Sequence, residues 1–440
     1  PVPRAIATLA IPPVISQVVA MVYNLADTFF IGQIGNPYMV AAVSLVFPWF
    51  NLLTALGNLF GIGGSSLISR LLGEKRGDEV RFVSAFSIWG GAVLTLVFSV
   101  LTYLARTPIL HFLGASPDTY GYAERYLFWV VVLGGVPTMA SQVFGHLLRS
   151  EGYVRPASAG MMFGGILNVV LDPILIFGMH LDVAGAAIAT AVSNALSVVF
   201  FIFEYARLGD RSVVSLHPRH FTFRFIRQIF SVGLASALAT TLGNLSNMAI
   251  VKLASGYGDI PVAAYGVVKK IDQLPLNVSM GLCQGSMPLV GYNYAAGNYR
   301  RMRAASVFSW KTALVMSACF VACFACFAPG ILHLFVREAQ TSTLGASFLR
   351  IACLAVPLTS VNFLISYTLQ AMGKGAQSAI LTSCRQGLVN IPLLLLMNAI
   401  VGLYGMIWTQ FVTEVIMLPV SLLMYRATFR RLPKAQAGRQ

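Results

Sequence analysis

Apolar residues follow one another in long runs along this chain, and charged residues are nearly absent from those runs. A helix needs about 20 apolar residues to cross the hydrocarbon core of a bilayer, so runs of this length predict membrane-spanning helices. The longest runs hold one such helix and part of the next. They cover residues 5–26, 28–69, 82–105, 228–251, 273–299, 351–373 and 386–413.

These runs predict an all-α integral membrane protein with twelve transmembrane helices. The two halves of the chain hold six spans each. In the first half we expect the spans at about residues 5–32, 39–71, 80–104, 121–149, 155–179 and 182–206. In the second half we expect them at about 224–254, 261–294, 302–328, 344–372, 375–400 and 402–426.

The second half repeats the first at a shift of roughly 220 residues. Matching positions include Val136-Pro137 with Val356-Pro357, Gly152 with Gly373, and Gly185 with Gly405. The repeat predicts two lobes, at 1–206 and 224–426, joined by a cytoplasmic linker at 207–223 and followed by a basic cytoplasmic tail at 427–440. Asp27 and Asp172 have no acidic counterpart in the second copy. A duplicated apolar protein with acids in only one copy suggests a transporter with an ion site in that lobe.

The composition supports a lipid environment and gives no sign of an enzyme. Hydrophobic residues make up 57% of the chain and charged residues 10%, whereas a soluble domain carries about a quarter charged residues. The sequence contains no zinc signature, nucleophile elbow or ATP-binding motif, so we expect no cofactor and transport driven by an ion gradient or by the substrate's own gradient. The spacing of Cys319, Cys323 and Cys326 is better explained by small apolar packing residues than by a metal site.

The basic residues predict the orientation in the membrane. The predicted outward loops hold only Arg106, Lys252 and Arg337, whereas the predicted inward loops and the termini hold most of the remaining Lys and Arg. By the positive-inside rule, both termini should be cytoplasmic. The formal charge of +15 then reflects topology and attraction to anionic membrane lipids. Nucleic acid is a poorer partner, because the basic residues are dispersed over loops.

The first helix carries a small and polar stripe at three- and four-residue steps. The stripe comprises Pro13, Ser16, Gln17, Ala20, Asn24 and Asp27, with Tyr23 beside it. Lipid cannot satisfy polar side chains, so this stripe should face the bundle interior, where Gln17 and Asn24 would line a substrate cavity. Pro12 and Pro13 remove backbone donors and predict a hinge. The alternative is that Asp27 only ends the helix at the outer interface.

Two further spans of the first half add polar pairs at i,i+4 spacing, which places both side chains of a pair on one face. The pairs are Asn168 with Asp172, and Thr190 with Asn194. Together with Asp27 they supply two carboxylates and several neutral oxygens, which could hold a shared proton or Na⁺. The matching positions of the second copy read Asn247, Leu388, Ile391, Gln410 and Glu414.

The eighth predicted span carries Lys269, Lys270 and Asp272 well inside its length. Lys269 and Asp272 at i,i+3 could pair on one face. The pair could contact substrate, or it could be a structural pair that lines a water-filled cavity. Arg385 and Glu414 pose the same question later in the chain.

At this point the residues resemble the multidrug and toxic compound extrusion (MATE) transporters. The resemblance covers nearly the whole chain and rests on the order and spacing of several short features. These are the two six-helix copies, Pro12 followed by Tyr23 and Asp27, Asn168-x-x-x-Asp172-Pro173 with Thr190 eighteen residues later, Gly185-Ala186-Ala187, and Pro288-Leu289-Val290-Gly291-Tyr292-Asn293. The amino-acid sequence of the second half is most similar to those of bacterial multidrug members.

The resemblance implies an antiporter in the bacterial plasma membrane that exports amphipathic, usually cationic, drug-like molecules in exchange for H⁺ or Na⁺. It implies an ion-coupling role for Asp27 and Asp172, with Asn168, Thr190 and Tyr23 as neighbours, and bending at Pro12. A two-lobed transporter of this kind needs no partner chain, so we expect a monomer.

Three rivals remain open. A flippase for an anionic lipid or lipid-linked sugar is favoured by Lys269, Lys270 and Arg385. An integral membrane enzyme lacks any catalytic constellation, and a structural membrane protein has no need of buried Asp27 and Asp172.

Overall fold

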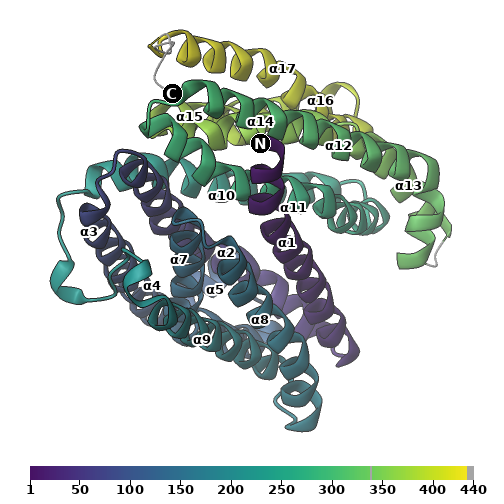
Figure 1. Cartoon of the computed structure of the whole chain (residues 1–440). Helices are drawn as coiled ribbons and strands as arrows, with labels where there is room; N and C mark the ends of the chain where they lie inside the picture. Colours follow the sequence, from purple (N-terminus) through teal and green to yellow (C-terminus); the bar gives the residue numbers. More distant parts are fainter. Residues whose placement is uncertain (337–338, 434–440) are drawn as a thin grey trace. The chain divides into compact units, whose positions relative to one another are not determined.

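A computed structural model describes residues 1–336 and 339–433 of the chain, and within these ranges it consists of helices joined by short connections, without a strand (Figure 1). Arg337, one of the three predicted outward basic residues, and residues 434–440 of the predicted tail lie outside the described residues.

The first half contains nine α-helices. They are α1 (Val2–Gln33), α2 (Pro37–Gly73), α3 (Val80–Ala85), α4 (Gly91–Leu104), α5 (Arg106–Leu113), α6 (Pro117–Leu127), α7 (Gly135–Ser150), α8 (Val154–Pro173) and α9 (Asp182–Leu208). Three π-helical turns extend or join them: η2 (Phe86–Gly90), η3 (Phe128–Leu133) and η4 (Ile174–Gly178). Short 3₁₀ turns lie at η1 (Gly77–Glu79), η5 (Gly209–Arg211) and η6 (Pro218–His220).

The described residues of the second half form eight α-helices. They are α10 (Ile226–Ser255), α11 (Asp259–Ala295), α12 (Tyr299–Phe335), α13 (Ala339–Cys353), α14 (Val356–Ala371), α15 (Gly375–Ser383), α16 (Asn390–Ile400) and α17 (Leu403–Arg430). A π-helical turn, η7 (Cys384–Leu388), joins α15 to α16.

The helices confirm the predicted all-α membrane fold. Among the described residues, nine helices are long and apolar enough to cross a membrane, and two bent helix pairs reach that standard together. The one predicted span outside this set coincides with α11, which carries Lys269, Lys270 and Asp272. With 37 residues, α11 is about 55 Å long, which exceeds the thickness of the hydrocarbon core. Each of the twelve predicted spans therefore coincides with a helix or a run of helices.

The two bent pairs occupy matching places in the repeat. The pair α6–α7 bends by 46° and the pair α13–α14 by 43°. The repeated Val136-Pro137 and Val356-Pro357 lie at the start of the second helix of each pair. A proline in the first turn removes a donor that has no helical partner there, so a helix can restart at that point without losing a hydrogen bond.

The same tight turn also recurs in both copies. Gly152 and Gly373 have φ values of +90° and +75°, in the left-handed region that favours glycine. Each turn is closed by a backbone hydrogen bond from the residue after the glycine, Tyr153 to Leu148 (3.0 Å) and Lys374 to Leu369 (2.8 Å). The repeat is therefore present in the backbone conformation as well as in the amino-acid sequence.

The chain forms two compact units whose boundaries fall inside helices. One unit is residues 15–240, and the other combines residues 1–14 with residues 241–440. The boundaries cut α1 after Val14, one residue past Pro12-Pro13, and cut α10 near its middle. The predicted lobes at 1–206 and 224–426 follow the sequence repeat, so each unit contains the start of one helix from the other copy. The predicted lobe, linker and tail boundaries, and the hinge at Pro12 and Pro13, stay predictions.

Small residues allow these exchanged segments to pack closely. A Cβ on Gly285 of α11 would lie 2.5 Å from the Cα of Ala10 on α1, inside the second unit. A Cβ on Gly233 of α10 would lie 2.0 Å from the carbonyl oxygen of Leu59 on α2, inside the first. Only glycine permits contacts this close, which is typical of helix packing in membranes.

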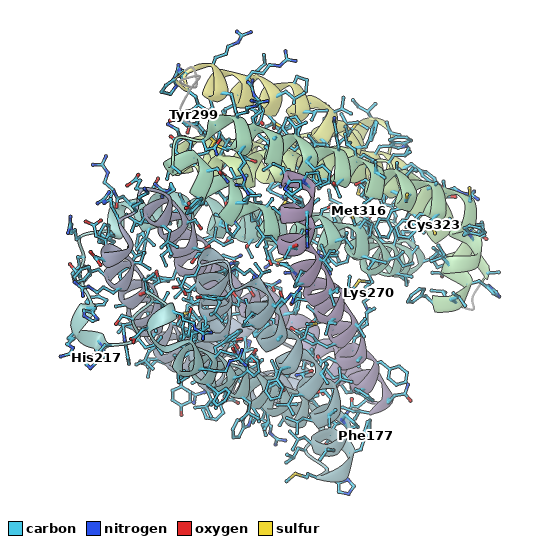
Figure 2. The ribbon with its side chains drawn as sticks, in the orientation of Figure 1. Phe177, His217, Lys270, Tyr299, Met316 and Cys323 are labelled. Carbon is cyan, nitrogen blue, oxygen red and sulfur yellow. The ribbon has the colours of Figure 1, made fainter. Side chains whose placement is uncertain are left out.

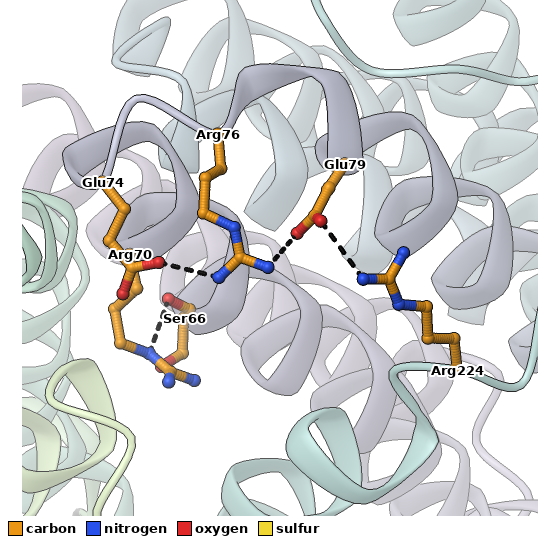
Figure 3. A network of polar contacts seen from close by, with 6 residues as sticks. All are labelled: Ser66, Arg70, Glu74, Arg76, Glu79 and Arg224. Carbon is orange, nitrogen blue, oxygen red and sulfur yellow. Dashed lines mark hydrogen bonds and ion pairs between the residues drawn. The ribbon is translucent and has the colours of Figure 1, made fainter.

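The predicted linker is held firmly against the unit that contains residues 15–240. The Glu151 carboxylate accepts hydrogen bonds from the Ser212 hydroxyl and the Val213 amide, each at 2.9 Å. The Trp89 indole donates to the Leu216 carbonyl at 2.9 Å. Arg224, at the end of the linker, binds Glu79 at 3.3 Å, and Figure 3 shows the network that continues through Arg76 to Glu74. We call residues 209–225 the strap.

The three grouped cysteines are not packing residues. Cys319, Cys323 and Cys326 are all exposed on α12, and Figure 2 labels Cys323 on that helix. All three lie on an exposed face of α12, so the interpretation of these cysteines as packing residues is wrong. In a bilayer such a face contacts lipid, and a thiol is apolar enough to do so.

Candidate functional site

The least exposed charged side chain of the first half is that of Asp172, near the end of α8. Its side chain is fully buried, and Asn168 one turn earlier is 3% exposed. Pro173 and the π-helical turn η4 follow directly. Proline supplies no backbone donor, and π-helical turns are frequent at functional sites, so the backbone changes its geometry just after the acid.

Asn168 links Asp172 to Thr190 on α9. The orientation of its amide that satisfies both neighbours places the nitrogen 3.2 Å from Oδ2 of Asp172, to which it donates. The amide oxygen then accepts from the Thr190 hydroxyl (3.1 Å) and the Thr190 backbone amide (3.3 Å). The i,i+4 spacing of Asn168 and Asp172 therefore does bring the two side chains together, and it adds Thr190 from a second helix.

Asp27 reaches the same place from α1. Its carboxyl group interacts directly with the carboxyl group of Asp172. Each carboxyl has an oxygen, Oδ1, that is buried without a hydrogen-bond partner. Asp27 is in contact with a buried acid, so the alternative that it merely ends the first helix does not describe its surroundings. Two carboxyls in contact cannot both carry full charge cheaply, so the arrangement favours a single proton or a cation between them.

Aromatic side chains cover this pair. Tyr23, one turn before Asp27, lies against α8 at Gly165, where a Cβ would be 2.9 Å from Cδ1 of the ring. Tyr126 of α6 is buried and lies close enough to interact electrostatically with Asp27, Asp172 and Tyr23. Tyr126 could not be predicted as part of the site, because nothing in its local spacing links it to the acids. We call Tyr23, Asp27, Tyr126, Asn168, Asp172 and Thr190 the acid pair site.

Other predicted residues of the first half lie elsewhere. Asn194 donates to the Thr138 hydroxyl of α7 at 3.0 Å, which is separate from the acid pair site. Asn24 is exposed, and Gln17 is half-buried on α1. Pro13 is buried and Pro12 half-buried, and α1 is helical through both. Their cavity and hinge roles stay predictions.

Glu414 of the second half is the centre of a different polar group. Its Oε1 lies 3.0 Å from Nη1 of Arg385 and accepts from Gln410 at 2.7 Å. Asn362 donates to its Oε2. Arg385 and Glu414 are 3% and 0% exposed, and the Arg385 guanidinium stacks 4.3 Å from the centre of the Phe363 ring. This buried acid is neutralised by a permanent cation.

A missed residue, Asn390, extends this group at the start of α16. It donates toward Gln410 (3.4 Å) and Thr413 (3.3 Å), and its oxygen accepts from Ser246 of α10 (2.7 Å). Asn390 precedes Ile391-Pro392, which the repeat aligns with Asp172-Pro173. The neighbouring proline was the signal that could have found it. We call Ser246, Asn362, Arg385, Asn390, Gln410, Thr413 and Glu414 the arginine–glutamate site.

The pairing that the i,i+3 spacing permits between Lys269 and Asp272 is not formed. The ion pairs of the described residues include no contact between these two side chains within 4.0 Å. They interact only at longer range, and Lys269 also interacts electrostatically with Tyr265. The i,i+3 spacing permits a pair but does not require it, since long side chains have several rotamers.

Comparison with known proteins identifies the family. The MatE family model matches residues 12–174 and 235–396, once in each copy. The multidrug export protein MepA of Staphylococcus saprophyticus is 34% identical over 424 residues, which cover 95% of this chain and 93% of that protein. The chain belongs to the MATE family of multidrug efflux transporters. Its relatives are membrane transport proteins rather than enzymes, and they use ion gradients rather than cofactors.

Solved structures of MATE proteins have the same fold. An outward-facing multidrug resistance MATE transporter of the MOP superfamily aligns with a TM-score of 0.91 and 26% identity, covering 98% of this chain and 96% of that one. A MOP superfamily transporter from Pyrococcus furiosus, described as having a binding pocket of reverse polarity, aligns with a TM-score of 0.88 and 27% identity, covering 98% and 96%. The MATE fold and the bacterial relatives make the chain a multi-pass bacterial membrane protein.

Proposed function

We propose that this transporter exports amphipathic organic cations in exchange for H⁺ by alternating access, and that the acid pair site carries the coupling proton. The supporting observation is the direct contact of the Asp27 and Asp172 carboxyls, each with one buried oxygen that lacks a partner. One proton placed between them supplies the missing hydrogen bond and removes the repulsion. No other residue type in the site could bind and release a charge so readily.

The hydrogen bonds favour H⁺ over Na⁺. A Na⁺ site at Asp27, Asn168, Asp172 and Thr190 would need several oxygens directed at the ion. The Asn168 oxygen is occupied by Thr190, and its nitrogen faces Asp172.

The energetics of proton exchange are sufficient for export. One proton driven by 100 mV yields about 2.3 kcal/mol, which maintains a substrate gradient of nearly fiftyfold. Protonation changes the contacts that hold α1 to α8 through the acid pair, so the two protonation states can favour different conformations. One chain suffices for this cycle, and we propose that it acts as a monomer.

The orientation is part of the same proposal. With both termini in the cytoplasm, the strap and the Arg76–Glu79 turn lie on the cytoplasmic side, where the positive-inside rule places basic residues. Gln17, Asn24 and Asn194 are proposed to contact substrate in the first lobe, with Lys269, Asp272 and Glu414 in the second.

Transport into inside-out proteoliposomes tests the proposal. The wild type should accumulate a fluorescent organic cation under an imposed pH gradient without Na⁺, and Asp27→Asn should abolish this. Asp182→Asn is the matched control, because Asp182 is an exposed acid at the start of α9. Accumulation that needs Na⁺ and no pH gradient would contradict proton coupling, and full activity of Asp27→Asn would remove the acid pair from the mechanism.

The flippase alternative has lost part of its support. It relied on Lys269, Lys270 and Arg385 as sites for an anionic lipid headgroup, but Glu414 neutralises Arg385. Lys269 and Lys270 remain, and the reverse polarity described for the Pyrococcus furiosus pocket keeps the question relevant. Loss of function in Lys269→Gln, with normal function of Asp27→Asn, would favour the flippase.

A further inference from the structure

Three residues of α11 place opposite charges on one face of the helix. Tyr265, Lys269 and Asp272 are spaced i, i+4 and i+7, which brings them to the same side. Lys269 lies ten residues from the start of α11, about 15 Å along its axis. Lys270 points about 100° away from Lys269 and is exposed (Figure 2).

This face makes contacts within the second unit. The Tyr265 hydroxyl donates to Oδ1 of Asn247 on α10 at 3.1 Å. The Tyr265 ring packs against the hydrophobic core formed by α11, α12 and α13, which includes Val268. Asp272 lies close enough to interact electrostatically with the buried thiol of Cys353 at the end of α13.

The two charges on this face are left without close partners. Among the described residues, Lys269 has no ion pair within 4.0 Å, and its interactions with Tyr265 and Asp272 are at longer range. Oδ1 of Asp272 is buried and accepts no hydrogen bond. A buried polar atom without a partner destabilises a protein unless something else satisfies it. In the same unit, by contrast, the buried charges of Arg385 and Glu414 lie 3.0 Å apart and satisfy each other.

We propose that Lys269 and Asp272 form a subsite for amphipathic zwitterions, in which a carboxylate of the substrate binds the Lys269 ammonium and a cationic or N–H group binds Asp272. The idea rests on the proposed export function and narrows its substrate class. A ligand with both charges satisfies both side chains together, whereas a simple cation satisfies only Asp272. The nearby Tyr265 ring would contact the apolar body of such a ligand.

Binding of two matched dyes to the purified protein tests this. Rhodamine 110 has a free carboxylate, and rhodamine 123 is its methyl ester, so the two share one cationic ring system. Fluorescence anisotropy should show that Lys269→Gln weakens rhodamine 110 binding about tenfold or more, as expected for loss of a charge-assisted hydrogen bond. Rhodamine 123 binding should change less than about twofold. Lys270→Gln is the control and should leave both dyes unaffected.

A second variant tests the other charge. Asp272→Asn should weaken both dyes by similar factors, because both contain the cationic ring system. Equal loss of the two dyes in Lys269→Gln would overturn the proposal and make Lys269 a structural residue. Equal binding of the two dyes by the wild type, unchanged in Lys269→Gln, would also overturn it. Failure of the export function is separable, because it appears as intact dye binding without gradient-driven accumulation of either dye.

Discussion

The acid pair site of the first copy and the arginine–glutamate site of the second occupy matching helices but treat their acids in opposite ways. In the first, Asp27 and Asp172 contact each other, and the Asn168 amide donates to Asp172. In the second, Glu414 is held by Arg385, Asn362 and Gln410. The Glu414 carboxylate thus faces a cation, because arginine does not lose its proton at physiological pH. The first site places two acids against each other, whereas the second places an acid against a cation, which is why we propose the first site for ion exchange.

The largest effect should come from breaking the arginine–glutamate pair. Arg385→Met leaves Glu414 buried without its cation, and removing one partner of a buried pair destabilises proteins by about 3–5 kcal/mol. Thermal unfolding in detergent should show a large fall in the apparent Tm. The double variant Arg385→Met/Glu414→Met should recover most of that loss, since apolar replacements of a buried pair are often neutral. A double variant as unstable as the single one would mean that this pair does more than balance charge.

The acid pair should affect transport and leave stability nearly unchanged. Asp172→Asn removes a group that could hold the coupling proton but keeps the volume and the hydrogen bonds to Asn168. Gradient-driven transport should fall at least about 100-fold, roughly 2.7 kcal/mol, with the apparent Tm maintained or raised because one repulsive charge is gone. A large fall in Tm would instead assign Asp172 a structural role like that of Glu414.

Asn168 should have an intermediate effect. Asn168→Ala removes the donor to Oδ2 of Asp172 and the acceptor for Thr190, so it alters the ionised state of the pair without removing either acid. Loss of one hydrogen bond to a charged group predicts a fall in transport rate of about tenfold. Ser197→Ala, which removes only the 3.1 Å hydrogen bond from the Ser197 hydroxyl to the Gly160 carbonyl between the same two helices, is the control and should change the rate by about twofold or less.

The smallest effect is expected at the strap. Burial raises the pKa of Glu151, although the hydrogen bonds from Val213 and Ser212 oppose this. The folded protein then binds more protons than the unfolded chain as pH rises above the ordinary Glu range, so Glu151 makes the folded state less stable toward neutral pH. Glu151→Gln keeps an acceptor for Ser212 and Val213 and cannot ionise. The difference in apparent Tm between variant and wild type should increase slightly from pH 4 to pH 7, and a decrease over that range would contradict the direction of the pKa shift.

The strap also shows where sequence reading was limited. The sequence repeat predicts residues 207–223 as the linker between the two copies, and this stays a prediction. Their attachment through Glu151, Trp89 and Glu79 could not be predicted, since those residues lie far away in the chain and no local pattern pairs them. The boundaries of the compact units could not be predicted from the sequence either. The repeat predicts a division between helices, whereas close packing at Gly285 and Gly233 gives each unit the start of a helix from the other copy.

The sequence alone determined the membrane class, the positions of the spans, the repeat and the list of intramembrane acids. The bilayer imposes these features locally, since every span must be apolar over a set length and any charged exception is conspicuous. The tertiary structure decided which of these charged residues come into contact with one another. It brought Asp27 to Asp172 from helices far apart in sequence, added Tyr126 and Asn390, gave Glu414 a cation and kept Lys269 apart from Asp272. Such contacts depend on how helices dock and which rotamers fit between them, and spacing along a single helix specifies neither.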